Sequence, residues 1–563
     1  MPALLASAIA LALADPALAA ADEPILEALQ AELARTMQAW EGQEDAPYFL
    51  GYRVSDSFQV ELRAEQGALA ASRADRRCLL DVSVRVGNPE LDNTHAIRDE
   101  YWFNQTGHQG LRLPCEGDVL ALRTEIWRET DQEIRDALRT IHKVRANRSV
   151  KVEETDRSPD FSREEPQVHL GEPAALEFDP RAWEPVIAGL SALLLADPSV
   201  EVAMVQLDAL ARTQTIVTSE GTRIRQPRTW LRVAMEIGST APDGMELDLY
   251  RWKDVHTPGD LPSQEVLRGW TDELLRDHAA LRAAPRGEPY SGPLILRGAA
   301  AGVFVHEVLG HRAEGHRQKD EDEGQTFRDQ VGRLVTHPSI TIYDDPRLET
   351  YANEFLNGHY LYDDEGQPAQ RAVIIEDGVF RGFLMSRSPI EGFGQSNGHG
   401  RAQDGRLPVS RMGNTVVESS EPMPWEQLRR RLIQALREQG RAWGLVVDEI
   451  GGGFTTTGRT FPNSFNVRVE TAWRVYADGR PDELVRGIDL VGTPLVAIGS
   501  IVAAGDDPAV FNGFCGAESG SVPNSAISPS LLMLQMEVQR KEKDQDRPPL
   551  LPRPDTEGEG RDS

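Results

Sequence analysis

The stretch from His306 to His311 constrains this chain most. It places two imidazoles and the carboxylate of Glu307 directly after the apolar run 299–305. Neutral imidazoles are good zinc ligands, and a carboxylate beside the metal can take a proton from water. The familiar HExxH motif puts its histidines one helical turn apart, whereas this segment reads HExxxH. On a regular α-helix the two histidines then point roughly 140° apart. They can share one metal only if the helix widens into a π-turn or breaks at Gly310.

A solvated helix face or a satisfied buried group is the alternative interpretation of these histidines, and the altered spacing favours it. Two features favour a metal site instead. The preceding residues are small and apolar, which predicts a buried helix whose polar groups need partners. Glu314 and His316 follow closely and add ligand-type side chains.

Further blocks follow the histidine motif in a fixed order along the second half of the chain. They are QVGRLV at 330–335, YDD at 343–345, YDDEG at 362–366, RMGNT at 411–415, GGG at 451–453 and GFCG at 513–516, with Val-Pro at 522–523. With the segment 298–315, these blocks resemble the TldD/PmbA family of metalloproteases, on the TldD side that carries HExxxH. The resemblance covers roughly residues 290–535 of this sequence.

The resemblance implies one zinc ion per chain, with His306, His311 and Cys515 as its ligands and Glu307 as the general base. Three protein ligands leave a fourth position for water, as in catalytic zinc sites. Glu314 is the competing third ligand, because it lies three residues after His311 on the same helical face. We favour Cys515, since the flanking glycines leave its thiol approachable.

The glycine run Gly451, Gly452 and Gly453 could be mistaken for a phosphate cradle. It lacks the following Lys-Ser/Thr, and no helix is predicted to begin there. Glycine admits close backbone approach, so we predict that these residues bind a substrate strand. By resemblance, the family binds peptides in extended form inside a cavity enclosed by a dimer, and strand addition of that kind tolerates varied side chains.

Two functions are therefore considered. The first is a zinc metallopeptidase that hydrolyses unstructured peptides or unfolded protein segments, as a homodimer or as a heterodimer with a paralogous subunit. The second is a non-catalytic peptide-binding scaffold or partner subunit of a TldD/PmbA-type complex. The intact His306, Glu307, His311 and Cys515 favour the first. The net charge of −29 argues against nucleic acid, which needs a basic face.

Residues 1–21 have the features of a signal peptide, with an apolar Ala/Leu run and an A-x-A type cleavage site after Ala19 or Ala21. The run is too short to span a bilayer, and we expect no membrane span in the mature chain. An exported, periplasmic protein is expected, or a cytoplasmic one if the leader is not cleaved. An oxidising compartment would permit a disulfide between Cys78 and Cys115, with two unpaired thiols as the alternative.

The length of 563 residues exceeds what one core supports and predicts two domains. We expect an α+β fold, with a mixed α/β domain at 22–285, a β-rich domain carrying the metal helix at 286–539 and a disordered tail at 540–563. A helix is predicted to start at Asp22, and others cover about 117–147, 183–194 and 425–439. Alternating patterns predict strands between 50 and 125 and between 200 and 255.

Overall fold

A computed structural model describes residues 16–97, 109–150, 156–320, 322–459, 464–541 and Pro554. Most of the predicted signal peptide, residues 1–21, lies outside the described residues, as does nearly all of the predicted tail, 540–563. Within the described ranges, no helix is both long and apolar enough to cross a bilayer.

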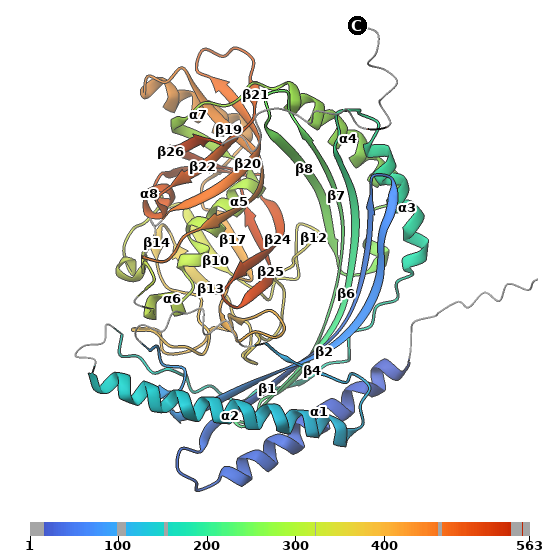
Figure 1. The fold of residues 1–563 in the computed structure, drawn as a ribbon. Coiled ribbons are helices and arrows are strands. Elements are labelled where there is room, and N and C mark those ends of the chain that lie inside the picture. The colour runs from blue at the N-terminus through green and yellow to red at the C-terminus, as the bar shows by residue number, and fades with distance from the viewer. Residues whose placement is uncertain are drawn as a thin grey trace, which may run out of the picture.

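The first half of the chain forms one strongly curved antiparallel sheet (Figure 1). Its strands run in the order β3-β2-β1-β6-β7-β5, with β4 paired to β2 and β8 paired to β7. Burial alternates along β6 as a sheet with one covered face requires. The strands are β1 Pro47–Glu65, β2 Ala68–Asn88, β3 Leu91–Asp92, β4 Leu111–Leu113, β5 Val168–Leu170, β6 Val202–Thr218, β7 Arg223–Thr240 and β8 Glu246–Val255.

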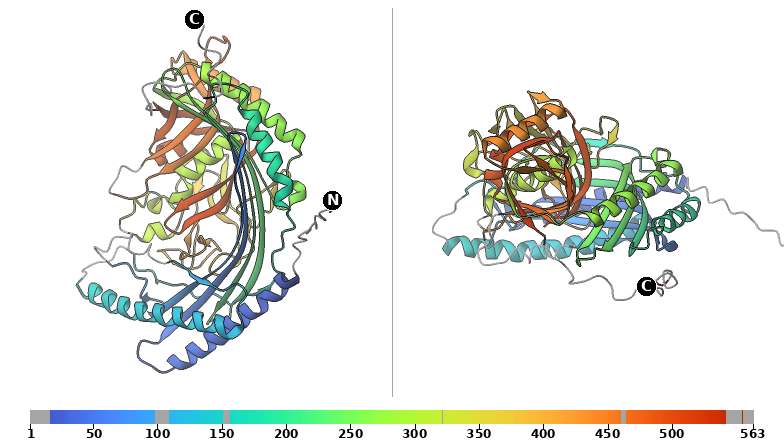
Figure 2. Two further views of the ribbon diagram at one scale, coloured as in Figure 1. Left: turned by 45° about the vertical axis from the view of Figure 1, so that its right-hand side comes forward. Right: turned by 90° about the horizontal axis from the view of Figure 1, so that it is seen from above.

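Four helices pack on this sheet: α1 Pro16–Trp40, α2 Val119–Val150, α3 Pro180–Leu194 and α4 Gln264–Ala283. Helices α3 and α4 lie along its convex side, and α1 and α2 lie across its lower end (Figures 1 and 2). The apolar faces of α3 and α4 share one core with β6, β7 and β8, and those of α1 and α2 share another with β1 and β2. The predicted start of α1 at Asp22 is wrong: the helix begins at Pro16, because proline suits a first helical turn and the following alanines favour helix.

The second half contains a small closed barrel and a second sheet. The barrel closes because β26 pairs with both β22 and β9, and the second sheet has the order β14-β13-β10-β17-β25-β24. The barrel sheet comprises β9 Tyr290–Leu296, β18 Pro422–Met423, β19 Trp443–Thr455, β20 Phe465–Tyr476, β21 Glu483–Val485, β22 Ile488–Gly492, β23 Ile501–Gly505 and β26 Leu531–Arg540. The second sheet comprises β10 Ile340–Asp344, β13 Ala372–Glu376, β14 Val379–Phe380, β17 Asn414–Ser419, β24 Ala509–Ala517 and β25 Gly520–Ser528.

Short elements complete this half. They are the hairpins β11 Thr350–Tyr351 with β12 Glu354–Phe355 and β15 Gly400–Arg401 with β16 Val409–Ser410, helices α6 His316–Lys319, α7 Trp425–Glu438 and α8 Pro494–Gly499, and 3-10 turns at Gly310–Arg312 and Arg328–Gln330. A further 3-10 turn, Pro258–Asp260, lies in the first half between β8 and α4. The mixture of helix and strand confirms the α+β class, with the β-rich second half as predicted. Helix α4 ends at Ala283 and β9 begins at Tyr290, and we propose that the two domains meet between them.

Helix α5, Gly298–Val308, is buried between the barrel and the second sheet. Two glycines one turn apart make this position possible. A Cβ at Gly298 would lie 2.8 Å from the Cβ of Ala509, and one at Gly302 would lie 3.1 Å from that of Ala526. The helix can therefore lie directly on β24 and β25, and its C-terminal end carries His306 and Glu307 to the place where the two sheets meet.

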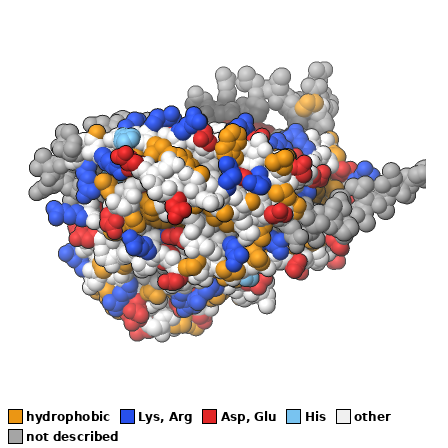
Figure 3. Space-filling model, turned by 90° about the horizontal axis from the view of Figure 1, so that it is seen from below, with side chains coloured by type: hydrophobic (Ala, Val, Ile, Leu, Met, Phe, Trp, Pro, Cys, Tyr) orange, Lys and Arg blue, Asp and Glu red, His pale blue; other side chains and the backbone are white. Residues whose placement is uncertain are grey.

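The two halves contact each other through buried and partly buried polar groups. Ser55 donates to Asp404 at 2.8 Å, Arg212 pairs with the same carboxylate at 3.0 Å, and Arg53 bridges Asp81 and Asp364. Seen from below, the surface carries acidic, basic and apolar side chains close together (Figure 3).

A disulfide joins Cys78 on β2 to Cys115, which follows β4, with 5.3 Å between the Cα atoms. The structure therefore has the disulfide and not the alternative of two unpaired thiols. Cys515 is a free, buried thiol.

Candidate metal centre

A break in helix α5 brings the two histidines to the same side. The α-helix ends at Val308, and Gly310–Arg312 forms a tighter 3-10 turn that swings His311 back toward His306. The two imidazole rings lie 5.0 Å apart and nearly perpendicular, at 86°. A Cβ at Gly310 would lie 2.0 Å from the sulfur of Met412, so glycine lets the turn pack against that side chain. The HExxxH spacing requires a widened or broken helix if both histidines are to face one metal. The structure has the break, at Gly310.

Cys515 reaches the two histidines from β24. Its Sγ lies 3.3 Å from Nε2 of His311, and the ligand atoms of Cys515, His306 and His311 all lie within 4.8 Å of one another. Tetrahedral zinc with Zn–S near 2.3 Å and Zn–N near 2.0 Å separates its N and S ligand atoms by about 3.5 Å. The three side chains are 5–7% exposed. This donor set fits a zinc ion that keeps one open position.

Electrostatics support the same interpretation. Burial disfavours the thiolate of Cys515, yet His311, His306 and Arg411 hold its pKa well below the usual range. Burial also opposes charge on His311, but the thiolate and Glu314 raise the pKa of that imidazole to about 10. Without a metal, these shifts favour a thiolate on Cys515 beside a protonated His311. A metal cation can replace that proton, since ligands must be deprotonated to bind it.

Glu314 lies behind His311 and not among the three ligand atoms. Its Oε2 lies 3.3 Å from Nδ1 of His311 and accepts from Nε of Arg317 at 2.8 Å, while Arg411 pairs with its other oxygen at 3.3 Å. Burial raises the pKa of this carboxyl, but His311 and the two arginines lower it to about 2. A carboxylate in this position fixes the ring and leaves Nε2 to face Cys515.

Asn524 supports the other histidine, with its side-chain nitrogen 2.9 Å from Nδ1 of His306. Arg411 also donates to the backbone oxygen of Cys515 at 2.6 Å and so connects that strand to Glu314. Sequence reasoning missed both residues. The available signals were a polar side chain directly after the Val-Pro pair at 522–523 and the arginine that opens the RMGNT block.

Glu307 is buried beside the ligands, at 6% exposure, and its Oε2 has no hydrogen-bond partner among the described residues. The glycine run predicted from the sequence passes directly over it. A Cβ at Gly453 would lie 2.8 Å from Cγ of Glu307, so only glycine fits there without displacement. Arg312 holds the end of the same strand by donating to the backbone oxygen of Glu307, to the hydroxyl of Thr455 and to the backbone oxygen of Thr456.

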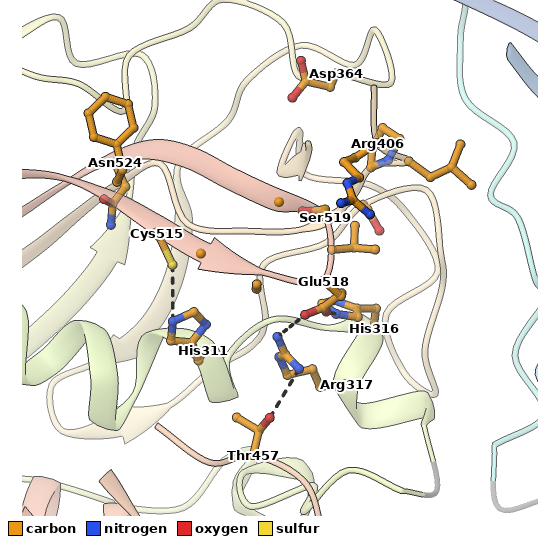
Figure 4. Close-up of a pocket in the computed structure, with 18 of the residues that line it drawn as sticks. His311, His316, Arg317, Asp364, Arg406, Thr457, Cys515, Glu518, Ser519 and Asn524 are labelled. Atoms are coloured by element: carbon orange, nitrogen blue, oxygen red, sulfur yellow. Dashed lines mark hydrogen bonds and ion pairs between the residues drawn. The ribbon is translucent and has the colours of Figure 1, made fainter. Parts of the chain in front are cut away.

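These groups line one wall of a cavity of about 2230 Å³ between the second half of the chain and the concave face of the N-terminal sheet. His306, Glu307, His311, Cys515 and Gly451 to Gly453 all contribute to the wall. In Figure 4 Cys515 faces His311, and Arg317 and Glu518 lie further along the same side. The opposite wall comes from β6, β7 and β8 and includes Asp208, Arg232, Glu236 and Trp252.

The fold and the site define an α+β protein with a buried His-His-Cys cluster that could hold a metal ion and that lines a large cavity. Residues 289–540 match the family model described as PmbA/TldA metallopeptidase C-terminal domain, which places this part of the chain in the TldD/PmbA family. It is 28% identical over 317 residues to a metalloprotease of Methanothermobacter thermautotrophicus, covering 55% of this chain and 64% of the relative.

A zinc metalloprotease TldD homolog of Saccharolobus solfataricus is 24% identical over 258 residues, covering 46% of this chain and 53% of that protein. The matches therefore span between about half and two thirds of these curated relatives. The crystal structure of TldE from Thermococcus kodakarensis aligns with a TM-score of 0.58 and 15% identity, covering 91% of this chain and 100% of that one. At that identity, the likeness shows the shared fold.

Proposed function

We propose that this protein is a zinc-dependent peptidase of the HExxxH type that hydrolyses unstructured peptides or unfolded protein segments. One zinc per chain is held by His306, His311 and Cys515, and Glu307 is the general base. The observation that carries the proposal is the convergence of three buried ligand atoms within 4.8 Å of one another, beside a buried carboxylate, on the wall of a large cavity. The zinc metalloprotease name of one relative supports the choice of metal.

A zinc ion in this cradle supplies a Lewis acid that acidifies water and polarises a carbonyl group. Glu307 takes the proton of the attacking water and later gives it to the leaving amine. Its Oε2 has no hydrogen-bond partner in the described chain, so that oxygen can accept this proton. Glu314 and Asn524 hold the two imidazole rings in orientation throughout.

The substrate backbone lies along Gly451 to Gly453 in this proposal. Strand β19 pairs with β9 only at Leu445 to Val447, and beyond this point its described partner is β20 alone. One edge of the glycine segment therefore remains for an extended peptide, whose main chain can add as a further strand. Recognition of that kind suits peptides of varied sequence that lack structure.

We further propose that the cavity is enclosed in a dimer, either of two copies or with a paralogous subunit. The N-terminal sheet of the same chain covers one side of the cavity, and its remaining opening is where a second subunit would exclude folded proteins. The likeness to a TldE structure supports a partner of similar fold. The alternative function is a peptide-binding scaffold. A scaffold of that kind would need neither Glu307 nor the three ligand side chains beside it.

Replacement of Glu307 by glutamine tests the proposal against the scaffold alternative. Glu307→Gln should keep the zinc and the bound peptide but lose about 10²–10⁴ in turnover, as expected for removal of a general base. Glu236→Gln, on the opposite cavity wall, is the matched control and should retain wild-type turnover. Turnover of an unstructured peptide mixture is followed by mass spectrometry, with zinc assayed in parallel. Equal cleavage by Glu307→Gln and wild type contradicts the base assignment, and peptide binding without cleavage by either favours the scaffold.

We also propose that the protein is exported and functions in the periplasm. The signal-peptide pattern at 1–21 motivates this, and the Cys78–Cys115 disulfide supports an oxidising compartment. N-terminal sequencing of the protein from its native host should find a terminus near Ala20 or Asp22. An intact Met1-Pro2 terminus on cytosolic protein contradicts export.

A further inference from the structure

The cavity beside the candidate metal centre contains exposed aromatic surface. Among the described residues only two phenylalanines are exposed, Phe454 at 64% and Phe514 at 46%, and both line this cavity. Phe454 follows Gly453 on β19, and Phe514 precedes Cys515 on β24. A single exposed apolar residue is ordinary on a protein surface. Two phenylalanines that flank one reactive centre inside a cavity instead provide the apolar lining that is typical of ligand sites.

The Phe514 ring is held by side chains of the N-terminal sheet. The ring of Trp230 on β7 meets it edge-on, with 5.3 Å between the centroids and 87° between the planes. The guanidinium of Arg232 lies 5.1 Å from the centroid of the Phe514 ring. Contacts of both kinds are favourable at these distances. Phe514 therefore has a preferred orientation although nearly half of its surface is exposed.

The supporting side chains are themselves fixed by the buried Asp254. Nε and a terminal nitrogen of Arg232 donate to its carboxylate, each at 2.7 Å, and Nε1 of Trp230 donates to it at 2.8 Å. Arg232 and Trp252 also donate to the backbone oxygen of Asn512, at 3.3 and 3.1 Å, and so connect the N-terminal sheet to β24. Because this aromatic wall is preorganised, a ligand does not have to order it on binding.

The wall around Phe514 suits an uncharged ring. Trp252 lines the cavity, as does Arg232, and its ring packs edge-on against Phe511 with 5.4 Å between the centroids. The positive charge of Arg232 is already matched by the carboxylate of Asp254. The wall therefore offers stacking area with a paired cation, which favours an aromatic side chain over an acidic one.

Phe514 lies at a fixed place relative to the candidate metal centre. Its Cα atom is about 3.8 Å from that of Cys515, because the two residues are adjacent. Successive side chains of a strand point to opposite faces, so the Phe514 ring leaves the space in front of the Cys515 thiol free. An extended peptide advances about 3.3 Å per residue. A peptide bond held at the metal centre can therefore place a side chain from within about two residues against Phe514.

We propose that Phe514, supported by Trp230 and Arg232 and flanked by Trp252, forms a subsite for an aromatic side chain of the substrate peptide. This inference rests on the proposed peptidase function and names a preference within it. Main-chain pairing along the glycine segment accepts peptides of varied sequence, and the subsite adds selection at one position near the scissile bond. Unfolded segments expose the aromatic side chains that folded proteins largely bury, so the preference suits that class of substrate.

A peptide series with one movable phenylalanine tests the subsite. Each peptide consists of alanine, serine and glycine with phenylalanine at a different position, and the cleavage sites are mapped by mass spectrometry. Wild-type protein should cut at a constant offset from the phenylalanine, within about two residues of it. Replacement of that phenylalanine by alanine should lower kcat/KM about tenfold or more, as expected for discrimination by an apolar pocket.

Substitution of Phe514 identifies the side chain responsible. Phe514→Ala should cleave the phenylalanine peptide no faster than the alanine peptide, while its zinc content and its turnover of the alanine peptide stay at wild-type levels. Phe514→Leu should keep part of the preference, since it keeps apolar area. Trp127→Ala is the matched control and should keep the full preference. Trp127 is 48% exposed on α2 and does not belong to the cavity lining formed by the described residues.

The outcomes separate this inference from the function on which it rests. Cleavage that ignores the phenylalanine, or a preference that Phe514→Ala retains, overturns the subsite and leaves the peptidase standing. An equal loss of turnover for both peptides in Phe514→Ala also overturns it, because that result indicates a structural role alone.

A binding measurement decides the subsite if wild-type protein cleaves neither peptide, in which case the peptidase assignment fails. The affinities of the labelled phenylalanine and alanine peptides are then compared by fluorescence anisotropy. Binding of the phenylalanine peptide that is about tenfold tighter, and that Phe514→Ala reduces to the level of the alanine peptide, supports the subsite. Equal affinities of wild-type protein for the two peptides overturn it.

Discussion

A methyl group added at Gly453 should impair catalysis by displacing Glu307. The new Cβ would lie 2.8 Å from Cγ and 3.2 Å from Cδ of Glu307, and 3.2 Å from the backbone oxygen of Asn466. Carbon atoms pack at about 3.5–4.0 Å, so one group has to move by roughly 1 Å. Asn466 belongs to the paired strand β20, and the Glu307 side chain is therefore the group that yields. A misplacement of about 1 Å costs roughly 10²-fold in rate, equivalent to about 2.7 kcal/mol of activation free energy.

The assay is turnover of an unstructured peptide by Gly453→Ala and wild type at equal zinc content. The matched control is Gly516→Ala, which adds the same methyl group beside Cys515 but meets no atom within 4 Å. The control should keep wild-type turnover. Wild-type turnover by Gly453→Ala would refute the reasoning, because it would mean that the position of Glu307 does not limit the reaction. Loss of zinc from Gly453→Ala would show that the methyl group acts through the ligands instead.

Three further substitutions test the centre and its surroundings. Cys515→Ala should reduce zinc from about one per chain to near none by elemental analysis, and unchanged zinc would exclude this thiol as a ligand. Asn524→Leu removes the group that faces His306, and zinc affinity measured by chelator competition should fall about 10–100-fold, with no change if the amide is irrelevant. Burial and the nearby Glu449 raise the pKa of Glu470 from 4.5 to about 7, so ionisation of this carboxyl destabilises the fold as pH rises through that window. Glu470→Gln should therefore increase the free energy of unfolding at pH 8 but not at pH 4, and an equal gain at both, in urea titrations, would contradict the shift.

Local patterns in the sequence predicted the elements that depend on neighbouring residues. The amphipathic segment 425–439 is helix α7, and the alternating segments between 200 and 255 are β6, β7 and β8. His306 and Glu307 were recognisable because their spacing and the apolar run before them lie within one helix. Side-chain periodicity is set over a few residues, and such features are therefore encoded locally.

Tertiary structure decided how distant groups meet. Cys515 lies more than two hundred residues from His311, and only the sheet order that places β24 beside α5 brings its sulfur within 3.3 Å. The HExxxH spacing left open whether the helix breaks, and the packing of Gly310 on Met412 is part of the answer. Sequence alone left Glu314 as a competing ligand, whereas the fold holds it behind His311 with two arginines. These outcomes depend on long-range packing, because the free energy of each contact exists only once the sheets that carry its partners have formed.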